Sequence, residues 1–274
     1  MHKTSSVKED EALAWQTGVW NTISQVYLRE VDPRFQPVVK SVLERSGLSS
    51  GQSVLDLGTG TGAVAIAAAV LVGTTGKVVG VDISKQMLDL AQAAAARKAL
   101  VNVSFREGRA ESIPAEEGGF DAVLASLSIM YVIDRQAAAQ EIARVLRPAG
   151  RFVAAVWSGP ERCDIVLFQQ TAGRFAPAPP VPGVGPGALA DPTEFLVQLG
   201  KAGVDAEVQT ETLGFDFPDF STAWEVLAGV TTAGLSPERQ EEAKRAVQTA
   251  MWPAGKGPRH FRNVTQFIVG QRKR

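Results

Sequence analysis

Residues 54–62 read Val-Leu-Asp-Leu-Gly-Thr-Gly-Thr-Gly, and nine apolar residues, 63–71, follow them. The apolar start predicts a buried strand that ends near Asp56, and residues 63–71 predict a helix. The three glycines between them allow a tight turn and a close approach of the backbone to a ligand. The free N–H groups of the first helical turn would point at that ligand. The stretch therefore predicts a nucleotide-type ligand site built from a strand, a glycine loop and a helix N-terminus.

Two cofactors are compatible with this loop. The spacing Gly58-x-Gly60-x-x-Ala63 satisfies the G-x-G-x-x-G/A pattern of dinucleotide sites. A dinucleotide would place a pyrophosphate at the loop, where the carboxylate of Asp56 would repel it. S-adenosylmethionine (SAM) instead carries an α-ammonium and a sulfonium, and a carboxylate suits both, so we expect SAM. The residues of this segment expected to bind it are Asp56, Gly58, Thr59, Gly60 and Gly62.

The composition argues against several classes of protein. The chain has 274 residues, with 28 basic and 29 acidic side chains and a net charge of −1, so no electrostatic footprint for nucleic acid is evident. Its single cysteine, Cys163, allows no internal disulfide and no cysteine cluster for a metal. Residues 1–10 are polar and charged, which is untypical of a secretory signal and predicts a frayed tail. No apolar run approaches the ~20 residues of a membrane span. We therefore expect a cytoplasmic protein, either a monomer or a homodimer.

Apolar strand patterns alternate with helical patterns along the chain, which predicts a doubly wound α/β sheet. The helices are expected to include residues 11–28, 33–47, 85–98, 135–146, 162–175 and 192–202, with residues 147–150 forming a turn. The seven predicted strands are residues 53–57, 77–82, 101–107, 120–125, 151–157, 204–217 and 260–269.

Asp82 ends the second predicted strand. A carboxylate at the tip of this strand can accept both hydroxyls of an adenosine ribose. The alternative role is a helix N-cap, but Ser84 already suits that position before residues 85–98. Ile83 and Met87 follow and could pack on an adenine face. We therefore expect Asp82, Ile83 and Met87 to bind the cofactor.

Three motifs in chain order resemble a known family. The form Asp-x-Gly-x-Gly-x-Gly at residues 56–62 resembles motif I of the class I SAM-dependent methyltransferases. Phe-Asp-x-Val at residues 120–123 and Glu-Ile-Ala-Arg-Val-Leu-Arg-Pro-x-Gly-x-Phe-Val at residues 141–153 are similar to the ubiquinone/menaquinone-type small-molecule methyltransferases. The resemblance covers about residues 50–157. It implies a Rossmann-like, seven-stranded, mostly parallel sheet whose last strand is antiparallel.

Two further segments acquire expected roles. In the resemblance, the residues after the third strand form the adenine-recognition loop, although family members often have an acidic residue where this chain has Arg109. Ligands of open parallel sheets lie beyond the carboxyl ends of the strands, so the end of the fourth strand should line the place where cofactor and substrate meet. The residues concerned are Arg109, Ala110, Glu111, Ser126 and Leu127.

Candidate bases are few. A base is needed only if the nucleophile loses its proton early in the reaction. Many members of the resembling family have a histidine pair after the fourth strand, where this chain has Met130 and Tyr131. The candidate catalytic residues are therefore His260, at the start of the seventh predicted strand, Tyr131 and Tyr27.

We expect residues 1–274 to form a single methyltransferase domain. Residues 1–49 form a helical lid, residues 50–157 a SAM-binding core, and residues 158–274 the rest of the sheet, with a cap insertion at about 218–258. Tryptophans and phenylalanines of the lid and cap suit a small hydrophobic or aromatic acceptor. The predicted function is SAM-dependent methyl transfer to such an acceptor by in-line displacement, through proximity and desolvation. An NAD(P)-dependent oxidoreductase and a non-catalytic SAM-binding protein remain the alternatives.

Overall fold

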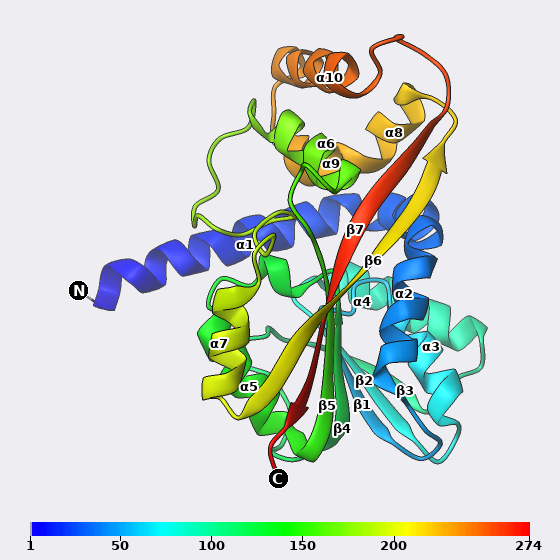
Figure 1. Cartoon of the computed structure of the whole chain (residues 1–274), viewed down its shortest axis with the longest axis vertical. Helices are drawn as coiled ribbons and strands as arrows, with labels where there is room; N and C mark the ends of the chain where they lie inside the picture. The colour runs from blue at the N-terminus through cyan, green and yellow to red at the C-terminus, as the bar shows by residue number, and fades with distance from the viewer. Residues whose placement is uncertain (1) are drawn as a thin grey trace.

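The computed structural model describes residues 2–274, and their side chains from Lys8 onward. Seven strands form one sheet in the order β3-β2-β1-β4-β5-β7-β6 (Figure 1). Strands β1 to β5 pair in parallel, and β7 is antiparallel to both β5 and β6. This confirms the predicted α/β sheet with an antiparallel last strand. The strands are β1 Ser53–Leu57, β2 Lys77–Asp82, β3 Val103–Glu107, β4 Phe120–Ser126, β5 Leu146–Trp157, β6 Val204–Phe217 and β7 Arg259–Arg272.

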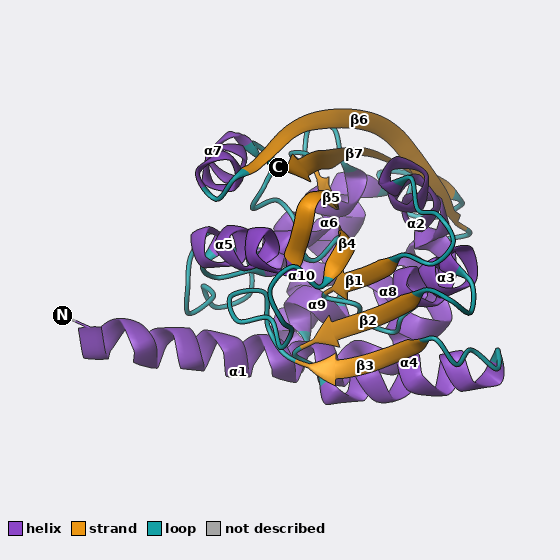
Figure 2. Ribbon diagram, turned by 90° about the horizontal axis from the view of Figure 1, so that it is seen from below, coloured by secondary structure: helices purple, strands orange, loops and turns teal. Residues whose placement is uncertain are grey.

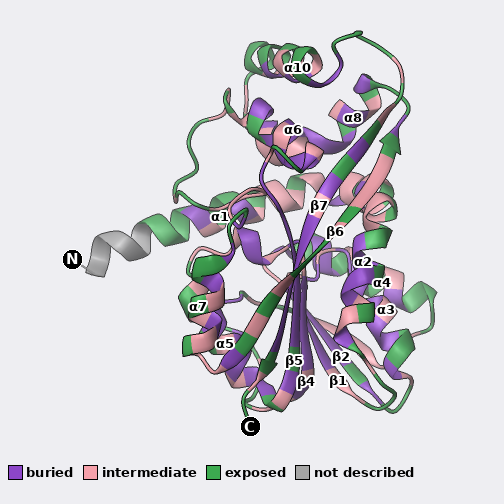
Figure 3. Cartoon of the chain, in the orientation of Figure 1, coloured by how far each residue is buried: buried purple, intermediate pink, exposed green. Residues whose placement is uncertain are grey.

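Helices cover both faces of the sheet. In Figure 2, α2 and α3 lie on one side, and α5 and α7 lie on the other. The central strands are buried on both faces (Figure 3), as their continuous apolar runs require. None of the helices in the described chain is long and apolar enough to cross a membrane. The helices of the two layers are α2 Asp32–Ser46, α3 Ala63–Val72, α4 Lys85–Arg97, α5 Arg135–Val145 and α7 Thr193–Lys201.

The lid is more helical than the sequence predicted. Helix α1 spans His2–Val26 and passes through one π-helical turn, Tyr27–Val31, into α2. The predicted frayed tail at residues 1–10 is therefore wrong for residues 2–10, while Met1 lies outside the described residues. No glycine or proline occurs before Gly18, so nothing in the sequence ends the helix early. Helix α1 contacts α4 and α9 (Gly229–Thr232), and its residues share a cavity wall with residues at the carboxyl ends of β1, β2 and β4.

Helices lie between β6 and β7, at the place where the sequence predicted a cap insertion. These two strands extend well beyond the rest of the sheet and lead to a helical layer at one end of the molecule (Figure 1). The layer also includes the helix that follows β5, which contacts α9 and α10. Its helices are α6 Asp164–Gly173, α8 Phe220–Leu227, α9 Gly229–Thr232 and α10 Pro237–Met251.

One predicted turn is instead part of a strand. Residues 147–150 lie within β5, which begins at Leu146 opposite Phe120. The register shifts between Phe120 and Ala122, and Ala149 has a φ of 61°. An irregularity of this kind lets extra residues stay within a strand by bending it. The Arg-Pro-x-Gly pattern therefore marks a bulge here rather than a turn outside the sheet.

Candidate active site

The glycine loop between β1 and α3 requires residues without side chains. Gly58, Gly60 and Gly62 have φ angles of 70°, 53° and 87°. The N–H groups of Gly58 and Thr59 donate to the carbonyl of Val81 at 2.8 and 2.9 Å, which ties the loop to β2. A Cβ on Gly58 would lie 2.3 Å from the Cβ of Ser128. The loop is therefore fixed by both its dihedral angles and its packing.

Asp56 supports this loop from behind. Its side chain is 1% exposed, and its Oδ2 accepts hydrogen bonds from Thr59 Oγ1 at 2.6 Å and from the Ala65 N–H at 2.9 Å. A cavity lies next to the glycine loop, at the carboxyl ends of the strands. Asp56, Thr59 and Gly62 do not line this cavity. The carboxylate is therefore not placed as the sequence predicted, because it is used to join the loop to the first turn of α3.

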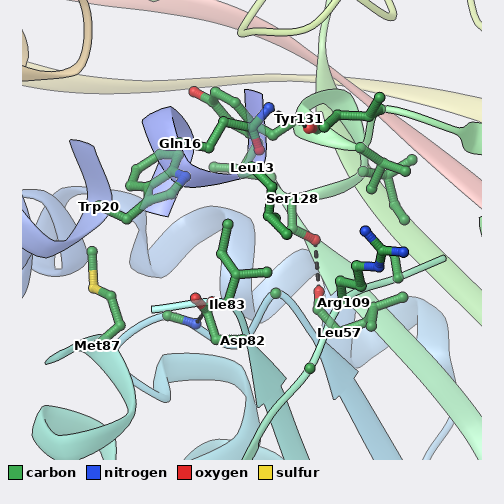
Figure 4. A pocket seen from close by; sticks show the side chains of 18 of the residues that line it. Leu13, Gln16, Trp20, Leu57, Asp82, Ile83, Met87, Arg109, Ser128 and Tyr131 are labelled. Atoms are coloured by element: carbon green, nitrogen blue, oxygen red, sulfur yellow. Dashed lines mark hydrogen bonds between the residues drawn. The ribbon is translucent and has the colours of Figure 1, made fainter. Parts of the chain in front are cut away.

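Asp82 combines two structural contacts with access to the cavity. Its Oδ2 accepts from the Gly60 N–H at 2.8 Å, and its Oδ1 accepts from the Ser84 N–H at 2.9 Å. The Ser84 hydroxyl accepts from the Met87 N–H, which confirms Ser84 as the N-cap of α4. Burial raises the pKa of Asp82, and the backbone donors partly oppose that rise. Asp82 therefore sets the shape of the glycine loop while its carboxylate borders the cavity (Figure 4).

The first cavity lies at the carboxyl ends of β1, β2 and β4, and its volume is about 120 Å³. In Figure 4, side chains from α1 lie across it from Asp82 and Ile83. The predicted residues that line it are Tyr27, Gly58, Gly60, Asp82, Ile83, Met87, Arg109, Ala110, Glu111, Ser126, Leu127 and Tyr131. Sequence reasoning missed Leu13, Gln16, Leu57, Gly108, Ser128, Ile129, Val132 and Ile133 in its wall.

The loop after β3 reaches the cavity with one buried and two polar residues. Ala110 is 7% exposed, whereas Arg109 is exposed. Glu111 uses Oε1 to accept the N–H groups of Ile133 and Asp134 at 3.1 and 3.3 Å. Glu111 therefore joins this loop to the segment that follows β4.

Three hydrogen bonds hold the lid against this site. Gln16 Nε2 donates to the Tyr131 carbonyl at 3.0 Å. The Ser84 hydroxyl donates to Asn21 Oδ1 at 2.7 Å. At the start of α2, Asp32 accepts from the hydroxyl of Thr61 in the glycine loop. The lid therefore contacts the site through α1, at Gln16 and Asn21, and through the start of α2, at Asp32.

A second cavity adjoins the first and opens between the lid and the cap. The two cavities share four wall residues, Trp20, Tyr27, Leu127 and Tyr131. The ring of Trp20 meets that of Tyr131 edge-on at 4.9 Å between centroids and that of Tyr27 at 6.2 Å. Leu127 has a φ of 56°, a strained angle for a leucine that the N–H bond to the Ala155 carbonyl at 2.8 Å helps to hold. Three aromatic rings and one strained leucine therefore mark the junction of the cavities.

The two tyrosines at the junction are poor candidates for a base. Burial raises the pKa of both Tyr27 and Tyr131 above its ordinary value, and nearby Asp32 raises that of Tyr27 further. Both phenols stay protonated at neutral pH, so they can donate and accept hydrogen bonds but do not supply a phenolate.

His260 does not belong to this site. Its imidazole is 55% exposed, and Nδ1 lies 2.8 Å from Asp216 Oδ1 on the neighbouring strand. It lines neither the first nor the second cavity. The β6–β7 register places His260 directly opposite Asp216, so the predicted catalytic role is replaced by a cross-strand pair on the protein surface.

The buried carboxylates predict an unusual pH dependence of stability. Burial raises the pKa of Asp56 to about 7 and that of Asp32 to about 6. The folded protein then holds protons that the unfolded chain has lost, so the free energy of unfolding should fall as pH rises from 5 to 8. Asp56 alone should account for roughly 2–3 kcal/mol.

Urea unfolding of the ligand-free protein at pH 5 and pH 8 checks this expectation. Carboxyls whose pKa is lowered, such as that of Glu141, complete their titration below this window. The Asp56→Asn variant should show a shallower slope than the parent protein. A free energy of unfolding that rises between pH 5 and pH 8 would contradict the assignment.

Comparisons with known proteins agree with this geometry. Residues 48–169 match the model of a family described as "Methyltransferase domain". A demethylmenaquinone methyltransferase of Lactococcus lactis is 38% identical over 118 residues, which are 43% of this chain and 47% of that protein. A nocamycin O-methyltransferase of Saccharothrix syringae is 41% identical over 117 residues, 43% of this chain and 42% of that protein. The chain thus spans about half the length of these curated relatives.

A solved structure extends the likeness of fold beyond the matched segment. The YcgJ protein of Bacillus subtilis superimposes with a TM-score of 0.62 over 86% of this chain and 98% of its own, at 20% identity. At that identity the likeness concerns the fold alone. Together with the glycine loop, Asp82 at the tip of β2 and the sheet order, the matches confirm the resemblance found in the motifs. Residues 48–169 form a methyltransferase domain of the class I SAM-dependent type, similar to the methyltransferases of ubiquinone and menaquinone biosynthesis.

Proposed function

We propose that this chain transfers a methyl group from SAM to a small hydrophobic or aromatic acceptor. The observation that carries the proposal is the meeting of two cavities at Trp20, Tyr27, Leu127 and Tyr131. The first cavity is bordered by Gly58 and Gly60 of the glycine loop and by Asp82, as a cofactor site would be. The second has mostly apolar walls from the lid and cap, as expected for a hydrophobic acceptor.

The first cavity fits SAM in three respects. Asp82 offers carboxylate oxygens to ribose hydroxyls, and the backbone of Gly58 and Gly60 leaves room for close approach. Ile83 and Met87 provide apolar surface for the adenine. When bound, SAM would supply a methyl group on a positively charged sulfur, ready for in-line displacement.

The chain's own contribution is to position the acceptor and exclude water. Trp20 and Tyr27 from the lid close over Leu127 and Tyr131 at the end of β4. Holding two reactants in contact distance removes much of the entropic cost of their encounter. Neutral phenols at this point could orient an acceptor through hydrogen bonds, and no side chain needs to act as a base.

For the acceptor, we propose a chemical class and not a particular compound. Relatives named for demethylmenaquinone and nocamycin methylation support ring-bearing acceptors, quinones among them. The alternatives from the sequence, a nicotinamide-dependent oxidoreductase and a non-catalytic SAM-binding protein, make different predictions about ligands and turnover. The cytoplasmic location and the choice between monomer and homodimer stay predictions.

Calorimetry with S-adenosylhomocysteine (SAH) tests the cofactor, and labelled SAM with a panel of quinones and phenols tests the transfer. We expect SAH to bind with a dissociation constant in the micromolar range and label to appear in at least one acceptor. NADH serves as the control ligand in a thermal-shift measurement. Stabilisation by NADH without stabilisation by SAH would favour the oxidoreductase, and SAH binding without transfer to any acceptor would favour the binding protein.

A further inference from the structure

The second cavity has an acidic residue and no basic one in the part of its wall that the structure describes. Its described lining residues include no lysine, arginine or histidine, and Glu225 on α8 is the only carboxylate among them. The other titratable side chains in the wall are Tyr27 and Tyr131, whose raised pKa keeps them neutral. Any formal charge that the wall presents to an acceptor is therefore negative.

The two glutamines of this cavity wall are already engaged in hydrogen bonds. Gln169 is 4% exposed, donates from Nε2 to the Leu227 carbonyl at 2.7 Å and accepts from the Thr231 hydroxyl at 2.9 Å. Gln240 donates to the carbonyls of Thr232 and Leu235 at 3.3 and 3.1 Å. These bonds hold the cap helices together and occupy both amides, so the phenols of Tyr27 and Tyr131 are the main side-chain donors left for a bound compound.

Glu225, in contrast, is uncommitted. Its side chain is exposed and forms no hydrogen bond or ion pair with any other described residue. The wall of the cavity also includes the aromatic rings of Trp20, Trp157 and Trp224. The face of such a ring attracts a cation and offers nothing to an anion. Burying a carboxylate there without a partner would carry a large cost in desolvation.

We propose that the second cavity selects a hydrophobic ring compound bearing a protonated amine, that Glu225 pairs with this ammonium group, and that the cavity rejects carboxylate-bearing compounds. Its assignment as the acceptor site rests on the proposed function. Its charge preference can be measured without cofactor and without methyl transfer, so the two proposals can fail separately.

Three probes with the same ring test the preference: 2-naphthylmethylamine, 2-naphthalenemethanol and 2-naphthoate. Binding is followed by tryptophan fluorescence at pH 7, with competition between probes as a second readout. We expect the amine to bind about five-fold more tightly than the alcohol, a modest gain because Glu225 is exposed. The carboxylate should bind at least about ten-fold more weakly than the alcohol. Equal binding of the carboxylate and the alcohol, or no binding of any probe at 1 mM, would overturn the proposal.

Charge variants locate the effect. Glu225→Gln should bring the amine down to the affinity of the alcohol, and Glu225→Lys should make the carboxylate bind more tightly than the amine. Glu116→Lys is the matched control, since Glu116 is exposed, lies before β4 and lines neither cavity. An unchanged order of the probes in Glu225→Lys, or the same reversal in Glu116→Lys, would show that Glu225 does not set the preference.

Discussion

The Asp82→Ala variant is expected to bind SAH about 100-fold more weakly than the parent protein. The substitution removes the proposed acceptor of the ribose hydroxyls, and charge-assisted hydrogen bonds contribute about 1.5–3 kcal/mol each. It also releases the Gly60 N–H, which Asp82 holds at 2.8 Å, so the glycine loop loses a constraint at the same time. A loss of about 2.7 kcal/mol corresponds to the factor of 100. Calorimetric titration with SAH measures it.

Asp89→Ala provides the matched control, because Asp89 is an exposed carboxylate on the adjacent α4, where it pairs with Lys85. Its SAH affinity should equal that of the parent protein. Thermal unfolding of both variants separates loss of binding from loss of folding. A folded Asp82→Ala protein with unchanged SAH affinity would remove Asp82 from the cofactor site.

Replacing Gly58 by alanine is expected to lower the free energy of unfolding by about 3 kcal/mol. Part of this is the positive φ of 70°, which an alanine adopts at a cost of about 1 kcal/mol. The larger part is overpacking, because the new Cβ would meet Ser128 Cβ at 2.3 Å and something must shift. Ser128 cannot move freely, since its hydroxyl donates to the Leu57 carbonyl at 2.6 Å. Urea unfolding measures the loss.

Gly60→Ala is the comparison within the same loop. Its φ is also positive, at 53°, but a Cβ there meets nothing within 4 Å. This variant should lose only about 1 kcal/mol of stability. The double variant Gly58→Ala/Ser128→Gly should regain part of the loss by removing the clash. Equal destabilisation by the two single variants would show that dihedral strain alone, rather than packing, makes Gly58 necessary.

The strands were predictable from the sequence because their signals are local. Partial alternation of apolar and polar residues predicted β6 with its observed bounds, Val204–Phe217, and a continuous apolar run placed Asp82 at the tip of β2. Ser84 was recognisable as a helix N-cap, because an N-cap depends on residues within one helical turn. Motif I located the glycine loop for the same reason.

The direction of a side chain and its distant partners were not predictable in this way. Asp56 was expected to face a cofactor cation, but the alternation along β1 and the packing of α3 turn it toward the Ala65 N–H. His260 depends on the register of a long hairpin, which pairs it with Asp216. Gln16 and Ser128 line the first cavity, and each forms a hydrogen bond with a residue far away in the sequence, 115 and 71 positions distant. No pattern in a single sequence marks such contacts.

The small overlap between the two cavities has a consequence for how such a protein could acquire new acceptors. Only Trp20, Tyr27, Leu127 and Tyr131 belong to both walls. The remaining wall of the second cavity includes no residue of the glycine loop or of β2. Substitutions in the cap can therefore accumulate under selection for a different acceptor while the wall of the first cavity stays intact, so diversification need not pass through forms that have lost their cofactor.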